Sequence, residues 1–124
     1  MWNSETVEVL KGKTMSSVAN NGDEELVFTT TGGETWKLYH EQDCCESVSI
    51  EDITGELSDL VGAPFLMAEE IQESGNPEGV EVRGEQESFT WTFYKFATIK
   101  GYVTVRWYGS SSGYYSESVN FCRA

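Results

Sequence analysis

The chain has 124 residues and a net charge of −13, and this length is typical of one domain that buries its core without disulfide or metal staples. It contains no apolar run of the roughly eighteen residues that a membrane span needs. It also begins without the basic and apolar regions of a secretory signal. We therefore expect one cytoplasmic domain over residues 1–124 that makes no membrane contact.

The excess negative charge lies in one segment. Residues 41–87 contain fourteen acids and one base, Arg83, whereas the two flanks together contain seven acids and seven bases. An acidic surface repels nucleic acid and attracts basic protein surfaces by long-range steering. We therefore expect a protein partner and no direct contact with nucleic acid. The alternative is that the charge only keeps the protein soluble.

The first forty residues indicate short strands joined by turns. The Asn-Gly pair within residues 20–23 is a turn signal, and Gly32 with Gly33 predicts a second tight turn. Because side chains alternate across a strand, Trp36 and Leu38 should lie on the apolar face of the strand over 34–39. His40 should share that face if the strand runs one residue further. The alternation of polar and apolar residues predicts strands over 5–10, 14–19, 25–30 and 34–39.

The middle third contains the only predicted helix. A brief strand over residues 49–53 leads to Thr54 as an N-cap, and residues 55–61 then form about two turns. Gly62 ends this helix, and Pro64 prevents its continuation.

Beyond the helix, the pattern predicts an extended segment over 65–68, a mobile acidic loop over 73–87 and a β meander over 88–121. We expect Arg106 to pair with Glu117 across the last hairpin. The fold class that follows is α+β, with mainly antiparallel hairpins and one short helix. The predicted strands of the meander are 89–96, 102–108 and 114–121, with turns at 99–101 and 109–113.

The densest group of reactive side chains lies in residues 40–46. This segment contains the only histidine, two of the three cysteines and three acids, which are the ligand types of a tetrahedral zinc site. The spacing matches no standard zinc finger, because no Cys-x-x-Cys pair is present. Inert burial of the cysteines, a hydrogen-bonded histidine and a disulfide to Cys122 are the alternatives. A reactive thiolate is disfavoured because neighbouring acids raise a thiol pKa.

No assembled catalytic set is visible in the sequence. The one histidine has no Gly-x-Ser-x-Gly elbow to support a Ser-His-Asp arrangement, and the glycine-rich pieces lie in predicted hairpins and open no helix. We therefore expect a protein that is not an enzyme and has no catalytic residues. The rival is a small-molecule-binding protein, or a thiol- or zinc-dependent enzyme, of phage origin.

Three stretches carry a resemblance to a known group of proteins. They are residues 39–48 (YHEQDCCESV), residues 50–53 with 60–64 (IEDI and LVGAP), and residues 91–104 (WTFYKFATIKGYVT). Together they resemble small phage- and prophage-encoded proteins of uncharacterised function, over roughly residues 10 to 121. The chain also resembles members of that group identified as anti-CRISPR proteins against type II effectors, at least one of which binds zinc.

The resemblance implies a structural zinc site at His40, Asp43, Cys44 and Cys45. It also implies inhibition by binding, in which an acidic surface occupies a basic face of a type II CRISPR RNA-guided nuclease and blocks target DNA loading. The resemblance also implies that Cys122 is peculiar to this chain, and the complete ligand set stays open. The side chains that could complete it are Glu41, Glu46, Glu70, Glu117 and Cys122.

Overall fold

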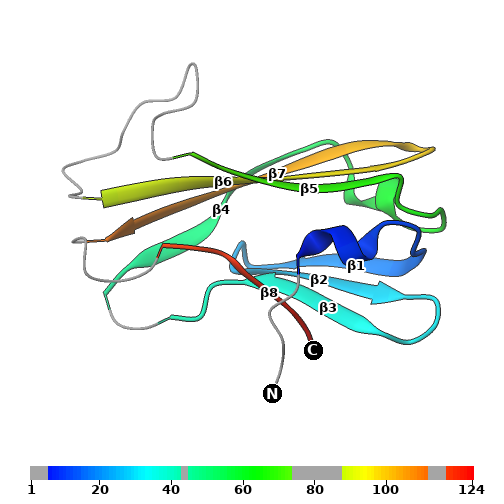
Figure 1. Cartoon of the computed structure of the whole chain (residues 1–124), viewed down its shortest axis with the longest axis horizontal. Helices are drawn as coiled ribbons and strands as arrows, with labels where there is room; N and C mark the ends of the chain where they lie inside the picture. The colour runs from blue at the N-terminus through cyan, green and yellow to red at the C-terminus, as the bar shows by residue number, and fades with distance from the viewer. Residues whose placement is uncertain (1–5, 43–44, 74–87, 112–116) are drawn as a thin grey trace.

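The computed structural model describes residues 6–42, 45–73, 88–111 and 117–124 (Figure 1). These ranges form two antiparallel sheets of four strands each, which lie one over the other (Figure 1). The first sheet has the order β1 (Met15–Asn21), β2 (Glu25–Thr30), β3 (Thr35–Tyr39) and β8 (Asn120–Arg123). The second has the order β4 (Ser47–Thr54), β7 (Gly101–Ser111), β6 (Ser88–Thr98) and β5 (Met67–Glu73).

One hydrophobic core fills the space between the two sheets. On β2, Leu26 and Phe28 are fully buried and alternate with half-buried residues, as expected for a strand with one face on the core. The rings of Phe28 and Phe96, which come from opposite sheets, meet edge to face with centroids 5.3 Å apart. Full burial of one such side chain stabilises the fold by about 1.5–3 kcal/mol. The core also includes Met15, Trp36, Leu38, Leu60, Phe65, Tyr94, Val103, Val105, Trp107 and Phe121.

The prediction of an α+β class with a helix over residues 55–61 is wrong, because the fold is mainly β. In the described residues the only helical elements are two four-residue 3-10 turns, η1 (Val7–Leu10) and η2 (Leu57–Leu60). Thr54 ends β4 and caps no helix. Gly55 has a φ of +100°, and Glu56 and Val61, which flank η2, have extended backbone angles, so no α-helix continues on either side of this turn. Burial of Leu60 in the core fixes this single turn.

The predicted strand over residues 5–10 is also wrong in the part that the structure describes. Residues Val7–Leu10 form η1. Residues three apart lie on the same side of a 3-10 turn, so Val7 and Leu10 are both buried. The short apolar-polar alternation fits a strand equally well, and only the position of the core distinguishes the two conformations.

The end of the chain differs from the predicted meander. The strand β7 continues to Ser111, through part of the turn expected at 109–113. Of the strand predicted over 114–121, residues 114–116 lie outside the described ranges, residues 117–119 form no strand, and β8 begins at Asn120. A meander would place β8 beside β7, but β8 instead pairs with β3 in the first sheet. Cys122 therefore lies within a strand. Long-range pairing of this kind has no local sequence signal.

The hairpins of the first sheet confirm the prediction from alternation. The strands β2 and β3 pair in register, and Trp36 and Leu38 are buried on one face. In the turn after β1, Asp23 has a φ of +62° and its backbone N–H donates to the Asn20 side-chain oxygen at 2.9 Å. The expected acidic loop begins at the end of β5, and its residues 74–87 lie outside the described ranges. No helix of the described residues is long and apolar enough to cross a membrane.

Candidate functional site

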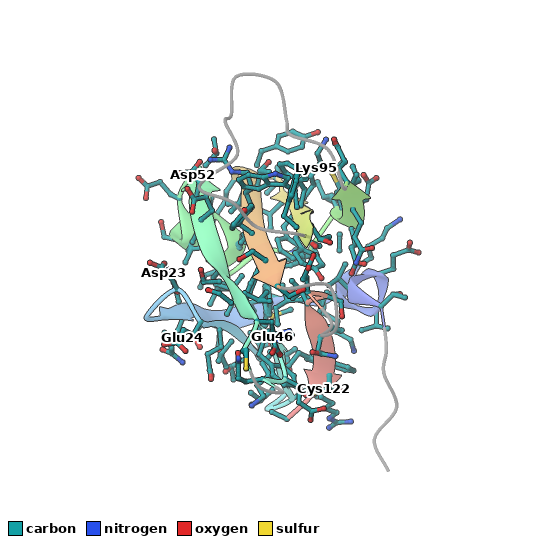
Figure 2. The ribbon with its side chains drawn as sticks, turned by 90° about the vertical axis from the view of Figure 1, so that its left-hand side faces the viewer. Asp23, Glu24, Glu46, Asp52, Lys95 and Cys122 are labelled. Carbon is teal, nitrogen blue, oxygen red and sulfur yellow. The ribbon has the colours of Figure 1, made fainter. Side chains whose placement is uncertain are left out.

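A buried ionisable pair joins the two sheets. His40 follows β3 directly, and Glu46, which is labelled in Figure 2, directly precedes β4. The Nε2 atom of His40 lies 2.6 Å from Oε2 of Glu46, and their side chains are only 4% and 0% exposed. Alternation along β3 turns His40 inward after Leu38, as the sequence predicts. The pair therefore lies at the crossing from the first sheet to the second.

A third partner comes from far along the chain. The Nδ1 atom of His40 lies 2.7 Å from the carbonyl oxygen of Ser118, just before β8. A carbonyl only accepts hydrogen bonds, so Nδ1 must carry a proton. The pair is then either an imidazolium facing a carboxylate or a neutral imidazole that accepts from a protonated Glu46. In both states each ring nitrogen has a hydrogen-bond partner. This arrangement suits a structural role, in which His40 holds the segments around Glu46 and Ser118 together.

Glu117 is a second buried carboxylate at the same end of the sandwich. It is 7% exposed and accepts hydrogen bonds from the hydroxyls of Thr90 at 2.8 Å and Ser111 at 2.6 Å. The predicted pairing of Arg106 with Glu117 is therefore wrong. The Arg106 guanidinium lies 5.3 Å from the ring centroid of Trp91, in cation–π geometry. Hydroxyl donors satisfy the Glu117 carboxylate without a cation.

The predicted zinc ligands are only partly described. His40 uses both ring nitrogens for hydrogen bonds, Cys45 is disulfide-bonded, and Asp43 and Cys44 lie outside the described ranges. Within the described residues, no three His, Cys, Asp or Glu side chains gather closely enough to hold a metal ion. As described, His40 and Cys45 do not fit zinc, because one lacks a free nitrogen and the other is no thiolate. Zinc at these residues stays a prediction.

Cys122 is separated from the buried pair by the first sheet. It pairs across the strands with Lys37, whereas Leu38 pairs with Phe121 on the core side. Its thiol is free and lies 3.9 Å from the Tyr39 hydroxyl. Burial, followed by this contact with the thiol, raises the pKa of Tyr39. Cys122 therefore faces away from His40 and does not extend the predicted ligand set in this geometry.

Acidic side chains collect at the two outer edges of the second sheet. At the β4 edge, the backbone N–H of Ile50 donates to the carbonyl oxygen of Asp23 at 2.7 Å, which brings the turn after β1 against β4. Figure 2 shows Asp23, Glu24 and Asp52 on this side of the molecule. At the opposite edge, β5 carries three more acids. The exposed acids in the described residues are Glu8, Asp23, Glu24, Glu41, Asp52, Glu56, Glu69, Glu70 and Glu73.

Five of the seven cations among the described residues, by contrast, are used in contacts within the protein. Lys13 pairs with Glu34 at 3.1 Å, and the hydrogen bond from Lys13 is the main cause of the lowered pKa of Glu34. Lys37 lies over the Tyr39 ring, and Lys100 donates to the Val61 carbonyl. Among ion pairs that join two described residues, the only acids are Glu34 and Glu46. Most of the exposed negative charge therefore faces solvent.

Sequence reasoning identified His40 and considered Glu46, but it missed the Ser118 carbonyl. The contact joins residues 78 positions apart, and no local pattern indicates it. Glu117 was considered only as a metal ligand or as a partner of Arg106. Its surroundings could not be predicted because Thr90 and Ser111 come from two neighbouring strands of the other sheet.

Comparison with known proteins places the chain in a family. Neither the curated proteins nor the solved structures include a match to this chain. A family described as a domain of unknown function, DUF7448, matches residues 8–121, which covers both sheets and both buried carboxylates. The chain therefore belongs to the DUF7448 family.

Proposed function

We propose that this protein acts by binding, with its acidic surface occupying a basic face of another protein. The observation that carries the proposal is the uneven use of charge: nine acids of the described residues are exposed, whereas five of the seven described cations are held in contacts with aromatic rings, a carbonyl or Glu34. Such a surface steers a basic partner toward it and repels acidic macromolecules, including nucleic acid.

The partner class that we propose is a type II CRISPR RNA-guided nuclease. Its support is the resemblance of residues 39–48, 50–53, 60–64 and 91–104 to phage-encoded anti-CRISPR proteins. These nucleases hold the guide–target duplex in a positively charged channel through backbone contacts. An acidic protein can occupy such a channel because phosphate contacts are largely electrostatic. The proposed outcome is that target DNA is not loaded.

The geometry of His40 gives less support to the rival, an enzyme at residues 40–46. A general base needs a nitrogen within reach of a substrate proton. Both nitrogens of His40 are engaged, at 2.7 Å and 2.6 Å, and its side chain is 4% exposed. A structural zinc would need His40 to release one partner and Cys45 to be reduced, so the binding proposal does not depend on metal.

A cleavage assay tests the proposed function. A guide-loaded type II nuclease is incubated with increasing amounts of the protein and then given target DNA, and both cleaved DNA and bound DNA are measured. We expect loss of both, with weaker inhibition as salt rises because exposed charges are screened. Full cleavage at saturating protein contradicts the nuclease as partner. Inhibition that salt does not weaken contradicts the acidic surface as its cause.

A further inference from the structure

The four outer strand edges of the two sheets are not equally protected. An exposed edge can pair with another chain, and proteins prevent this with bulges, short strands, charge or covering segments. The register of β1 shifts between Met15 and Ser17, and that of β4 shifts between Ile50 and Asp52. The Ile50 N–H is also occupied by the Asp23 carbonyl. β8 has only four residues. Three edges are therefore irregular, covered or short.

The edge of β5 is regular. Its seven residues pair with β6 without any register shift, from Met67 with Ala97 to Glu73 with Trp91. No strand among the described residues pairs with the other side of β5, which lies at the edge of its sheet (Figure 1). The turn η1 packs beside the start of this strand, where Glu8 lies near residues 66–69, and just before β5 the Gly12 N–H donates to the Phe65 carbonyl at 2.8 Å. All residues from position 69 to position 73 are exposed.

The side chains of this edge select the charge of a partner. Glu69, Glu70 and Glu73 place three acids on seven residues, and Ile71 between them is 40% exposed. A second copy of β5 on this edge would set glutamates against glutamates, and like charges on adjacent strands are destabilising. A strand with lysine or arginine would instead gain opposite-charge pairs along its length. Charge therefore protects this edge against a second copy and leaves it open to a basic segment.

A hollow beside the start of β5 offers room for a side chain. Its volume is about 200 Å³, and it is lined by Glu8, Lys11 and residues 66–69. Leu66 at its rim is 62% exposed. Strand addition obtains affinity from backbone hydrogen bonds and specificity from pockets for side chains. This hollow is placed to receive a side chain of a strand that runs along β5.

We propose that the β5 edge binds a basic, extended segment of the partner protein as a fifth strand of the second sheet. The inference rests on the proposed function and deepens it, because it names the surface and the conformation of what is bound. Backbone hydrogen bonds along residues 69–73 hold the added strand, and its cations face Glu69 and Glu73, which share one face of β5.

A peptide titration followed by NMR tests this edge in the intact protein. The probe has seven residues, equal to β5, alternates lysine and valine and is blocked at both ends. We expect chemical-shift changes and slowed amide exchange at residues 69–73. The same peptide with glutamate in place of lysine should not bind. A probe with N-methylated backbone nitrogens keeps its charge but cannot add as a strand, so equal binding of that probe overturns the proposal.

Charge variants separate the edge from the net charge. The double variant Glu69→Lys, Glu73→Lys should weaken peptide binding about tenfold or more, since several cross-strand pairs become repulsive. The matched control, Glu24→Lys with Glu56→Lys, changes net charge equally at exposed positions outside β5 and should stay within about twofold. Equal weakening by both variants overturns the proposal. If the Glu69→Lys, Glu73→Lys variant has a lower melting temperature than the parent, Glu69→Gln with Glu73→Gln replaces it, because this change removes the negative charges without adding positive ones.

The cleavage assay distinguishes this inference from the proposed function. Loss of inhibition in the Glu69→Lys, Glu73→Lys variant, with inhibition retained in the Glu24→Lys, Glu56→Lys control, supports both. Equal inhibition by the two variants keeps the proposed function and rejects the β5 edge as its surface. Peptide binding at residues 69–73 without any inhibition keeps the edge as a docking surface and rejects the nuclease.

Discussion

His40 and Glu46 form a buried pair whose Nε2 to Oε2 distance is 2.6 Å, and they come from the two ends of the segment that connects the sheets. Gln42, within that segment, donates from its side chain to the Glu46 carbonyl at 2.7 Å. With the Ser118 carbonyl on the other ring nitrogen, the imidazole links three separate stretches of chain. The most conspicuous sequence motif of this protein is therefore a structural junction in the described residues.

The first prediction concerns this pair. His40→Ala leaves the Glu46 carboxylate buried without its partner, which should cost about 3–5 kcal/mol of unfolding free energy. The double variant His40→Leu, Glu46→Met should recover much of this loss, because two apolar residues leave no orphaned charge. Urea denaturation measures both. Glu41→Ala at the exposed neighbour is the control, expected within about 0.5 kcal/mol of the parent. A similar small effect for His40→Ala contradicts the junction.

The second prediction concerns zinc. Because His40 has no free ring nitrogen and Cys45 is disulfide-bonded, a strong chelator should leave the melting temperature of the oxidised protein unchanged. Elemental mass spectrometry of the oxidised and reduced protein accompanies the melts. Zinc at one per chain in the oxidised protein, lost with stability on chelation, would contradict the described geometry. Zinc bound only after reduction would support the ligand set predicted from the sequence.

The third prediction concerns Gly55, where β4 ends. Its φ is +100°, and an added Cβ would collide with the Tyr102 carbonyl oxygen. Gly55→Ala must therefore shift backbone, which we expect to cost more than about 2 kcal/mol. Gly33→Ala is the matched control, because Gly33 has a φ of +93° and open space around a Cβ. That variant should cost only about 1 kcal/mol. Equal losses in thermal melts would show that steric contact with Tyr102 does not matter.

The fourth prediction concerns Tyr94 and alkaline pH. The Tyr94 side chain is fully buried, and among the described residues its hydroxyl lies near Glu70 but makes no hydrogen bond of ordinary geometry. Burial, with a smaller contribution from Glu70, raises the pKa of Tyr94 above its ordinary value of 10.0. Above that pH the unfolded chain releases this proton and the folded chain keeps it. Stability therefore falls as pH rises past 10, by about 1.4 kcal/mol per pH unit from this group.

Tyr94→Phe should remove that part of the alkaline loss and change stability little near pH 7, since no hydrogen bond is lost. Denaturation curves at several pH values from neutral to above 10 measure the difference. Tyr102→Phe, at a side chain that is 65% exposed, controls for removal of a phenol. An unchanged alkaline slope in Tyr94→Phe would contradict the buried, protonated phenol.

The sequence by itself determined the strands whose signal is local. The alternation over residues 25–30 and 34–39 and the Asn-Gly turn before them set the two hairpins of the first sheet, because one strand face must be apolar and the Asn-Gly turn needs residues that tolerate positive φ. It also determined that His40 points inward after Leu38. The net charge and its excess over residues 41–87 are likewise properties of the sequence alone.

Only the tertiary structure decided the remainder. Val7–Leu10 and Leu57–Leu60 form 3-10 turns because the core lies on one side of them, and short patterns cannot report where a core is. β8 follows β7 in the chain but pairs with β3 in the other sheet. This path brings the Ser118 carbonyl to His40, and it brings Glu117 to the hydroxyls of Thr90 and Ser111. The regular free edge of β5 likewise exists only because of the strand order. Contacts between distant residues depend on the fold as a whole, and local sequence does not encode them.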